Sequence, residues 1–288
     1  MVTKTKTREK RTASMHVLNM HIPSHILLSI WTIIAVFPIW VMVVNSFKTA
    51  RTIYANPFWI PRTFNFKNYY TILTGHNFLL YFRNTFVVVV LSLVLILIFS
   101  SLAAYALANW KTKLSHWVFL FIIAGMMLPI RIASIRLLEI IRALGLDNTM
   151  WSLPPVYLAM SIPIGVFILT GFVRQIPHEL IEAGFVDGAG HGRIFLTIIV
   201  PMLRPALATV GIYNLVPIWN DLWFPLIFIT RDSDKTLILG VQNMFGQYFT
   251  DWSKVLALLT LSALPVILLY LSMSKQFIKG LTAGALKG

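Results

Sequence analysis

The chain has 288 residues, of which 57% are hydrophobic and only 12% are charged. Soluble domains carry about 25% charged residues, so this composition excludes a soluble globular protein and indicates a membrane protein. Lys and Arg outnumber Asp and Glu by 24 to 10, giving a formal net charge of +14, and the absence of cysteine excludes disulfide bonds, thiolate metal sites and cysteine nucleophiles.

The spacing of charges predicts six membrane-spanning helices. A helix needs about 20 apolar residues to cross the hydrocarbon core of a bilayer. Six windows of roughly that length contain at most one charged residue, and they cover residues 26–44, 84–110, 114–130, 148–173, 205–230 and 255–274. The sequence therefore predicts an all-α membrane protein with a six-span transmembrane domain over residues 25–277. Pro163 and the Pro154-Pro155 pair are expected to let the fourth span bend.

Residues 1–24 precede the first span and carry a basic cluster made up of Lys4, Lys6, Arg8, Lys10 and Arg11. We expect a disordered tail that the positive-inside bias holds in the cytoplasm. An even number of spans places the C-terminal tail, residues 278–288, on the same side. A count over the whole chain discriminates weakly, because this orientation puts 13 of the 24 basic residues inside, the five of the cluster included, and 11 outside.

Residues 48–83 form the first long connection, on the outer side. They are rich in aromatic residues, including Trp59, Phe64 and Tyr70. Aromatic side chains favour the boundary between lipid and water, so we expect this segment to lie at the interface.

The cytoplasmic connection, residues 174–204, contains a predicted short helix. Pro177 suits the first turn of a helix, and Glu179 and Glu182 lie near the N-terminus, where the helix dipole favours carboxylates. Gly188 or Gly190 is expected to end it. The helix carries more apolar residues than a solvated loop requires, so we expect other residues, of this chain or of a partner, to pack on it.

Two chemical interpretations of this loop are disfavoured. His178 and Glu179 begin like a zinc-protease motif, but the second histidine is replaced by Glu182, so no metal site is expected. The glycines from Gly188 to Gly192 follow no strand and precede no Gly-Lys-Ser/Thr, so no phosphate-binding loop is expected here, and none occurs elsewhere in the chain.

The same loop resembles the signature of binding-protein-dependent ABC importer permeases. The matching positions have the family spacing, and they are Glu182, Ala183, Gly184, Gly188, Ile198, Val200 and Pro201. Gly184 replaces the usual Ala and Val200 the usual Leu. The rest of the chain resembles the maltose-type carbohydrate permeases at residues 45–48, 104–108, 144–149, 219–221, 225–226 and 280–288.

The resemblance implies a type I ABC importer permease fold with a cytoplasmic coupling helix. It implies a transport subunit, not an enzyme, of an ATP-driven importer of a sugar or oligosaccharide in a bacterial or archaeal cytoplasmic membrane. The implied partners are a second, homologous permease, a dimer of ATPase subunits and an extracytoplasmic solute-binding protein. No catalytic residue, cofactor or nucleic-acid partner is expected for this chain, since ATP and magnesium would belong to the ATPase.

The resemblance also assigns three sets of contacts. The expected ATPase-coupling residues are Glu182, Ala183, Gly184, Asp187, Gly188, Ile198 and Pro201, although these residues could merely cap a loop helix. A C-terminal ATPase contact is expected at Gln276, Lys279 and Gly280, where glycines favour a flexible tail; a frayed terminus is the alternative. A loop that reaches the binding protein is expected to use Gln242, Asn243 and Gln247.

Polar residues inside a span are costly and therefore informative. The fifth span holds Tyr213, Asn214, Trp219, Asn220 and Asp221. They are expected either to line the translocation path, with an aromatic ring for a sugar and amides for its hydroxyls, or to close helix contacts near the outer interface.

A secondary carrier or channel that works without ATP is the alternative function. Asp221 is the only acidic residue within the six windows, whereas a membrane hydrolase or proton-coupled carrier normally needs paired ionisable groups. The charge of the sugar stays open, since Arg131 and Arg136 can steer an acidic substrate or simply snorkel to the interface.

Overall fold

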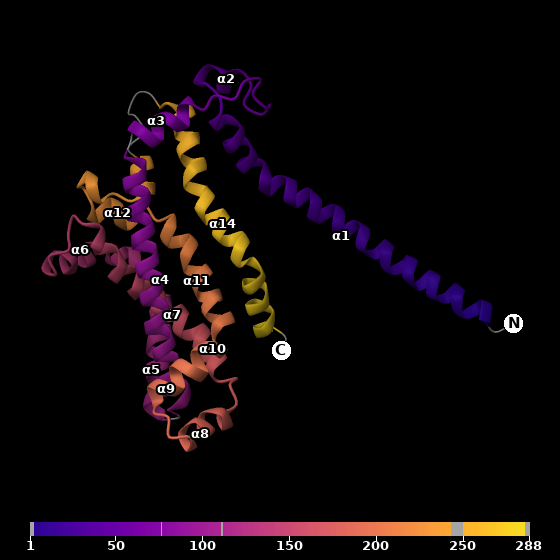
Figure 1. Ribbon diagram of the computed structural model, residues 1–288, viewed down its shortest axis with the longest axis vertical. Coiled ribbons are helices and arrows are strands. Elements are labelled where there is room, and N and C mark those ends of the chain that lie inside the picture. The colour runs from indigo at the N-terminus through magenta and orange to yellow at the C-terminus, as the bar shows by residue number, and fades with distance from the viewer. Residues whose placement is uncertain (1–2, 76, 111, 243–249, 286–288) are drawn as a thin grey trace. The chain divides into compact units, whose positions relative to one another are not determined.

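The computed structural model describes the backbone of residues 3–75, 77–110, 112–242 and 250–285, and the side chains of residues 23–271 outside the same gaps (Figure 1). Within these ranges the chain is helical and contains no β-strand. It divides into two compact units, one formed by residues 1–70 and 251–260 and the other by residues 71–250 and 261–288.

The first unit contains α1 (Thr3–Ser46), α2 (Ala50–Ala55), the start of α3 (Lys67–Gly75) and the start of α14 (Trp252–Ala285). Helix α1 begins at Thr3, so the prediction of a disordered basic tail is wrong for residues 3–22. These residues contain no glycine or proline. They extend a helix that the apolar span has already nucleated, and each added residue contributes a hydrogen bond without a new nucleation cost.

The second unit is built around the pair α4 (Phe78–Asn109) and α7 (Leu153–Val173), which run side by side (Figure 1). Helix α11 (Arg204–Trp219) packs against both, and α5 (Lys113–Ala124) packs against α7. Helix α7 starts with prolines in its first turn and continues through Pro163 without a break. Its side chains Val166 and Leu169 are fully buried.

The third predicted span is bent. Helix α5 continues into η1 (Gly125–Met127), and after an 82° bend the chain forms η2 (Ile130–Ala133) and α6 (Ser134–Ala143). Leu128 is extended, with ψ at 121°, because the following Pro129 disfavours the helical conformation of the residue before it.

The fifth predicted span, residues 205–230, follows a sharp bend and is interrupted once, so it is not one continuous helix. A 74° bend separates the segment His191–Met202 from α11. Helix α11 ends at Trp219, and α12 (Trp223–Phe228) begins after Asp221. The Asp221 carboxylate accepts hydrogen bonds from the backbone N–H groups of Trp223 (3.3 Å) and Phe224 (3.2 Å), which starts the new helix.

Among the described residues, four helices are long and apolar enough to cross a membrane, and the count is six when each bent pair is one span. Helix α14 supplies the last span and extends to Ala285. The tail from residue 278 is therefore helical up to Ala285, against the expectation of a flexible tail.

Candidate functional site

The predicted cytoplasmic helix is present as α8 (His178–Val186). Pro177 occupies the position before it, and Glu179 lies in the first turn. Gly188 has a φ of +76°, a left-handed conformation that glycine adopts without strain. The N–H groups of Gly188 and Ala189 donate to the carbonyls of Phe185 and Gly184, both at 2.9 Å, which caps the helix.

One face of α8 packs on the chain itself. Ile181 and Gly184 are buried. A Cβ atom at position 184 would lie 3.0 Å from Ile194 Cγ1 and 3.3 Å from Ile198 Cδ1, so Gly184 allows α8 to approach α9 (His191–Ile194) and η4 (Phe195–Ile199) closely. The structure thus places Gly184 and Ile198 in an internal contact, whereas the sequence had suggested a contact with a partner.

The opposite face of α8 is exposed and mixes acidic with apolar side chains. Glu182, Ala183 and Asp187 lie on it, and Val186 is 87% exposed. Pro201, in the following helix α10 (Val200–Met202), is exposed as well. His178 Nε2 lies 3.9 Å from Glu182 Oε1, but both side chains are more than half exposed, so this pair adds little to stability. We call this face of α8 the exposed α8 face.

A pocket of about 310 Å³ lies between α7 and α11. We call it the central pocket. Its polar lining consists of Arg131, Tyr157, Ser161, Tyr213, Asn214 and Asp221. The Tyr157 hydroxyl donates to Asp221 Oδ2 at 2.9 Å, and the Arg131 guanidinium carbon lies 5.8 Å from the centre of the Trp223 ring. The pocket therefore combines aromatic rings with a carboxylate, a cation and an amide.

The five polar residues predicted for the fifth span lie in different environments in the structure. Tyr213, Asn214 and Asp221 line the central pocket, whereas Trp219 and Asn220 do not. Trp219 is only 2% exposed, and its indole N–H donates to the Ser262 carbonyl at 3.1 Å. Asn220 is exposed and bonds back to the Val216 carbonyl. Trp219 is thus a packing residue in this structure and is not available to stack on a sugar.

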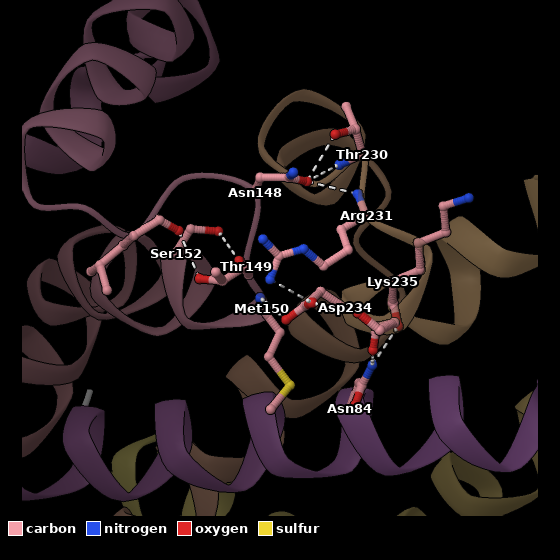
Figure 2. Close-up of polar contacts among 11 residues, drawn as sticks. Asn84, Asn148, Thr149, Met150, Ser152, Thr230, Arg231, Asp234 and Lys235 are labelled. Atoms are coloured by element: carbon pink, nitrogen blue, oxygen red, sulfur yellow. Dashed lines mark hydrogen bonds and ion pairs between the residues drawn. The ribbon is translucent and has the colours of Figure 1, made fainter.

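The segment from Thr230 to Leu237 is held on two sides, and Figure 2 shows its contacts with residues 148–150 and with Asn84. We call this arrangement the outer clasp. Asn84 Nδ2 donates to the carbonyls of Ser233 (2.8 Å) and Lys235 (3.1 Å). Across from α4, the Met150 N–H donates to Asp234 Oδ1 at 3.2 Å. The clasp therefore connects α4 to the chain that leads into α7.

Asn148 forms the other half of the outer clasp. Its Oδ1 accepts from the Thr230 N–H (2.8 Å), the Thr230 hydroxyl (2.8 Å) and the Arg231 N–H (2.6 Å), as Figure 2 shows. Its own N–H donates to the Phe228 carbonyl at 2.9 Å. Its φ is +56°, an uncommon conformation that asparagine tolerates better than most residues.

Asp232, in η5 (Asp232–Asp234), ties the clasp to the start of α4. Lys235 Nζ lies 3.0 Å from Asp232 Oδ1, and the Tyr81 hydroxyl donates to the same oxygen at 2.8 Å. These hydrogen bonds, the one from Lys235 first and then the one from Tyr81, lower the pKa of the Asp232 carboxyl from its ordinary value. The bonds that involve its charged form are lost as the pH falls through that lowered pKa.

The outer clasp precedes the loop predicted to reach a binding protein. Of the three residues named for that loop, Gln242 is the last residue of α13 (Leu237–Gln242) and is exposed. Asn243 and Gln247 lie outside the described residues. At the C-terminus, Gln276, Lys279 and Gly280 are helical residues of α14, and their side chains lie outside the described ones.

Sequence reasoning did not single out Tyr157 or Ser161 for the central pocket. Both are polar side chains in the fourth window, and this polarity within a span was the available signal. Asn148 was noticed only as part of the stretch 144–149 that resembles the maltose-type permeases. Its role as an acceptor of three hydrogen bonds depends on contacts more than 80 residues away along the chain.

Comparison with known proteins matches nearly the whole length of this chain. It is 40% identical over 264 residues to a putative ABC transporter permease of Caldicellulosiruptor, covering 91% of this chain and 96% of that protein. It is 33% identical over 282 residues to the melibiose/raffinose/stachyose import permease MelC of Bacillus subtilis, covering 98% and 100%. The multiple sugar-binding transport system permease MsmG of Streptococcus mutans is also 33% identical, over 267 residues that cover 91% and 96%.

Solved structures support the fold. A bacterial ABC transporter involved in the import of the acidic polysaccharide alginate matches with a TM-score of 0.79 and 21% identity, over 90% of this chain and 96% of that chain. This confirms the predicted type I permease fold. Residues 96–282 match the family described as "Binding-protein-dependent transport system inner membrane component". The chain belongs to this family of ABC importer permeases, as the signature in its cytoplasmic loop had indicated.

Proposed function

We propose that this chain is the permease subunit through which a sugar or oligosaccharide crosses the cytoplasmic membrane by alternating access. The observation that carries the proposal is the end-to-end similarity, at 33% identity, to a permease named for melibiose, raffinose and stachyose import. ATP hydrolysis belongs to a separate chain in this family. A dimer of such ATPases, a second permease and an extracytoplasmic binding protein complete the proposed transporter, with both termini of this chain in the cytoplasm.

The central pocket is the proposed wall of the sugar path in this subunit. Carboxylate, amide and hydroxyl groups pair with sugar hydroxyls, and the Tyr213 ring, which is 54% exposed, offers an apolar face to a sugar ring. Its volume of about 310 Å³ suits one or two sugar units at a time. Tyr213, Asn214 and Asp221 are thus the path residues supported by the structure.

Reconstitution tests the transport function directly. The chain is purified with its cognate second permease and ATPase, placed in liposomes and supplied with its binding protein. We expect uptake of a neutral oligosaccharide that requires ATP, and ATP hydrolysis that the sugar-loaded binding protein stimulates. A panel of neutral and uronate oligomers identifies the substrate. Sugar flux through the chain alone, without any ATPase subunit, would instead establish the secondary carrier or channel.

The exposed α8 face is the proposed contact with the ATPase, on the cytoplasmic side. Glu182 is its charged anchor, since an exposed carboxylate beside apolar side chains suits a basic cleft. Ala183, Asp187 and Pro201 lie exposed nearby. Gly188 ends the helix, and the C-terminal residues Gln276, Lys279 and Gly280 supply a second proposed contact.

Reversing the charge of Glu182 is expected to weaken binding of the ATPase at least about tenfold, because an attractive contact becomes a repulsive one. Membrane insertion should not change, since the side chain is exposed. Binding of the purified ATPase to Glu182→Lys permease in detergent measures the effect. Glu179→Lys is the matched control, because Glu179 is also an exposed acid on α8, and we expect a loss below about threefold. Undiminished association and transport of Glu182→Lys would contradict the assignment.

A further inference from the structure

The stretch Asn45 to Lys48, one of those that resemble the maltose-type permeases, organises the outer segment that follows α1. Asn45 Nδ2 donates to the Pro57 carbonyl at 2.7 Å, and the Ser46 hydroxyl lies 2.5 Å from the Tyr69 hydroxyl. The Phe47 ring contacts three aromatic rings of residues 64–69. This stretch therefore holds residues 49–69 folded back against the end of α1.

Lys48 is a buried cation that has no acidic partner among the described residues. Its side chain is 3% exposed, and its Nζ donates to Asn45 Oδ1 (2.8 Å), to the Asn56 carbonyl (2.7 Å) and, more weakly, to the Pro57 carbonyl (3.4 Å). Burial lowers the pKa of this amine from its ordinary value. Neutral oxygen atoms solvate the charge but do not cancel it, so the surrounding segment keeps a positive potential.

Beside Lys48 lies a pocket of about 510 Å³, which we call the outer pocket. Its polar lining comprises Lys48, Thr49, Thr52, Asn56, Arg62, Thr63 and Asn65, and no acidic side chain is among the described residues that line it. Arg62 and Thr63 are exposed, and Trp59 adds an exposed aromatic ring at 74%. The hydroxyls of Thr49 and Thr52 are hydrogen-bonded to each other, which uses one of their two protons. The pocket thus offers the Arg62 guanidinium group, the Thr63 hydroxyl and one hydroxyl of the Thr49–Thr52 pair as hydrogen-bond donors, next to a buried ammonium group.

All charged residues of the outer segment, residues 48–83, are basic. Between Glu9 and Glu139 the sequence contains no acidic residue, while residues 48–83 contain Lys48, Arg51, Arg62, Lys67 and Arg83. Basic residues are normally enriched in cytoplasmic connections, not in outer ones. An outer segment with five cations and no anion is therefore complementary to an acidic partner.

We infer that the outer pocket receives an acidic side chain of the extracytoplasmic solute-binding protein, whose carboxylate pairs with Arg62 and with the threonine hydroxyls. The inference rests on the proposed function, since it requires a binding protein. An arginine pairs with a carboxylate through two parallel hydrogen bonds, and Lys48 strengthens the attraction without giving up its own three bonds. Charge complementarity selects this partner, and the size of the pocket admits the tip of a protruding loop.

Two variants of equal charge test the inference in the assembled transporter. Arg62→Gln and Arg51→Gln each remove one positive charge from the outer segment, but Arg51 does not line the pocket. Affinity of the purified binding protein is measured for each complex in nanodiscs of zwitterionic lipid and again with anionic lipid. We expect Arg62→Gln to raise Kd about tenfold in both lipids, and Arg51→Gln to raise it less than about twofold.

A zero-length cross-link identifies the partner. Arg62→Lys places an amine in the pocket, and a carbodiimide joins an amine to a carboxylate within contact distance. We expect one dominant cross-linked peptide that contains an Asp or Glu of the binding protein, and none from Arg51→Lys. Equal losses of affinity in the two glutamine variants would overturn the inference, because binding would then depend on the total positive charge of the outer segment and not on the outer pocket. A loss of affinity seen only with anionic lipid would also overturn it, because the pocket would then bind a lipid headgroup.

The proposed function is checked separately in the same samples. Sugar-stimulated ATP hydrolysis by the unmodified complex, at saturating binding protein, reports whether the transporter works at all. If the unmodified complex is active and Arg62→Gln binds the binding protein normally, only the outer-pocket inference fails.

Discussion

Replacing Gly165 with valine is expected to destabilise the transmembrane unit by about 1–3 kcal/mol, the range for overpacked cores. A Cβ atom at position 165 would lie 2.4 Å from Ser100 Oγ and 2.9 Å from Ser100 Cβ. The hydroxyl can rotate away, but Ser100 Cβ is attached directly to the backbone of α4. The valine must therefore push α4 and α7 apart, at the most extensive helix contact of the unit.

The fraction of monodisperse permease left after heating in detergent measures this effect. Gly171→Val is the matched control, because Gly171 lies on the same helix and a Cβ atom there meets nothing within 4 Å. Both variants place a β-branched residue in α7, so the difference between them isolates the contact with Ser100. Equal midpoints for the two variants would show that the helices can separate without cost.

Asn148→Ala is expected to lower stability by about 2–3 kcal/mol. The variant loses the acceptor of three hydrogen bonds from Thr230 and Arg231, and each bond typically contributes about 1 kcal/mol. It also puts a Cβ without a polar group into the left-handed conformation at φ +56°, which costs about 1 kcal/mol or more. Because the Thr230 and Arg231 contacts are partly open to water, the total is less than the sum of these terms.

Two further substitutions separate the causes. Asn148→Gly relieves the backbone strain but lacks the acceptor, and Asn148→Asp keeps an acceptor at the same place. We expect the loss of thermal stability to decrease from alanine to glycine to aspartate. If alanine and glycine behave alike, the backbone conformation contributes nothing. If all three match the unmodified protein, the outer clasp does not hold residues 230–237.

The loop of residues 174–204 was well predicted because its signals are local. Pro177 before the helix, acids in the first turn and Gly188 after the last turn each act on neighbouring residues, and α8 has the predicted ends. The burial of Gly184 was not predicted, because it depends on Ile194 and Ile198 folding back over the helix. Spacing along the chain showed that a small residue was needed there, but not which surface required it.

The fifth span was predicted less well, because its structure depends on contacts that the local sequence does not show. Hydropathy treats residues 205–230 as one apolar window, yet Asp221 caps a second helix and so breaks the span. A single acid in an apolar run is equally compatible with a lined path, a helix contact or a cap. Only the positions of Tyr157 and of the α12 backbone show that Asp221 serves as a cap and lines the central pocket.

Composition and the distribution of charges along the sequence were enough to show that this is a membrane protein, since only 12% of its residues are charged and it contains six long apolar windows. The signature of its cytoplasmic loop then indicated the family, because spacing within one short helix is a local property. The tertiary structure decided which polar residues share a pocket, which are clasped to distant segments and which are merely packed. The positive charge of the chain also has a part that the sequence shows and a part that only the structure shows. The sequence shows that residues 48–83 hold five basic residues and no acidic one. Only the fold shows that Lys48 is buried beside the outer pocket, which Arg62 lines. Contacts between residues far apart in the chain depend on how helices pack, and helix packing is not encoded by any one segment.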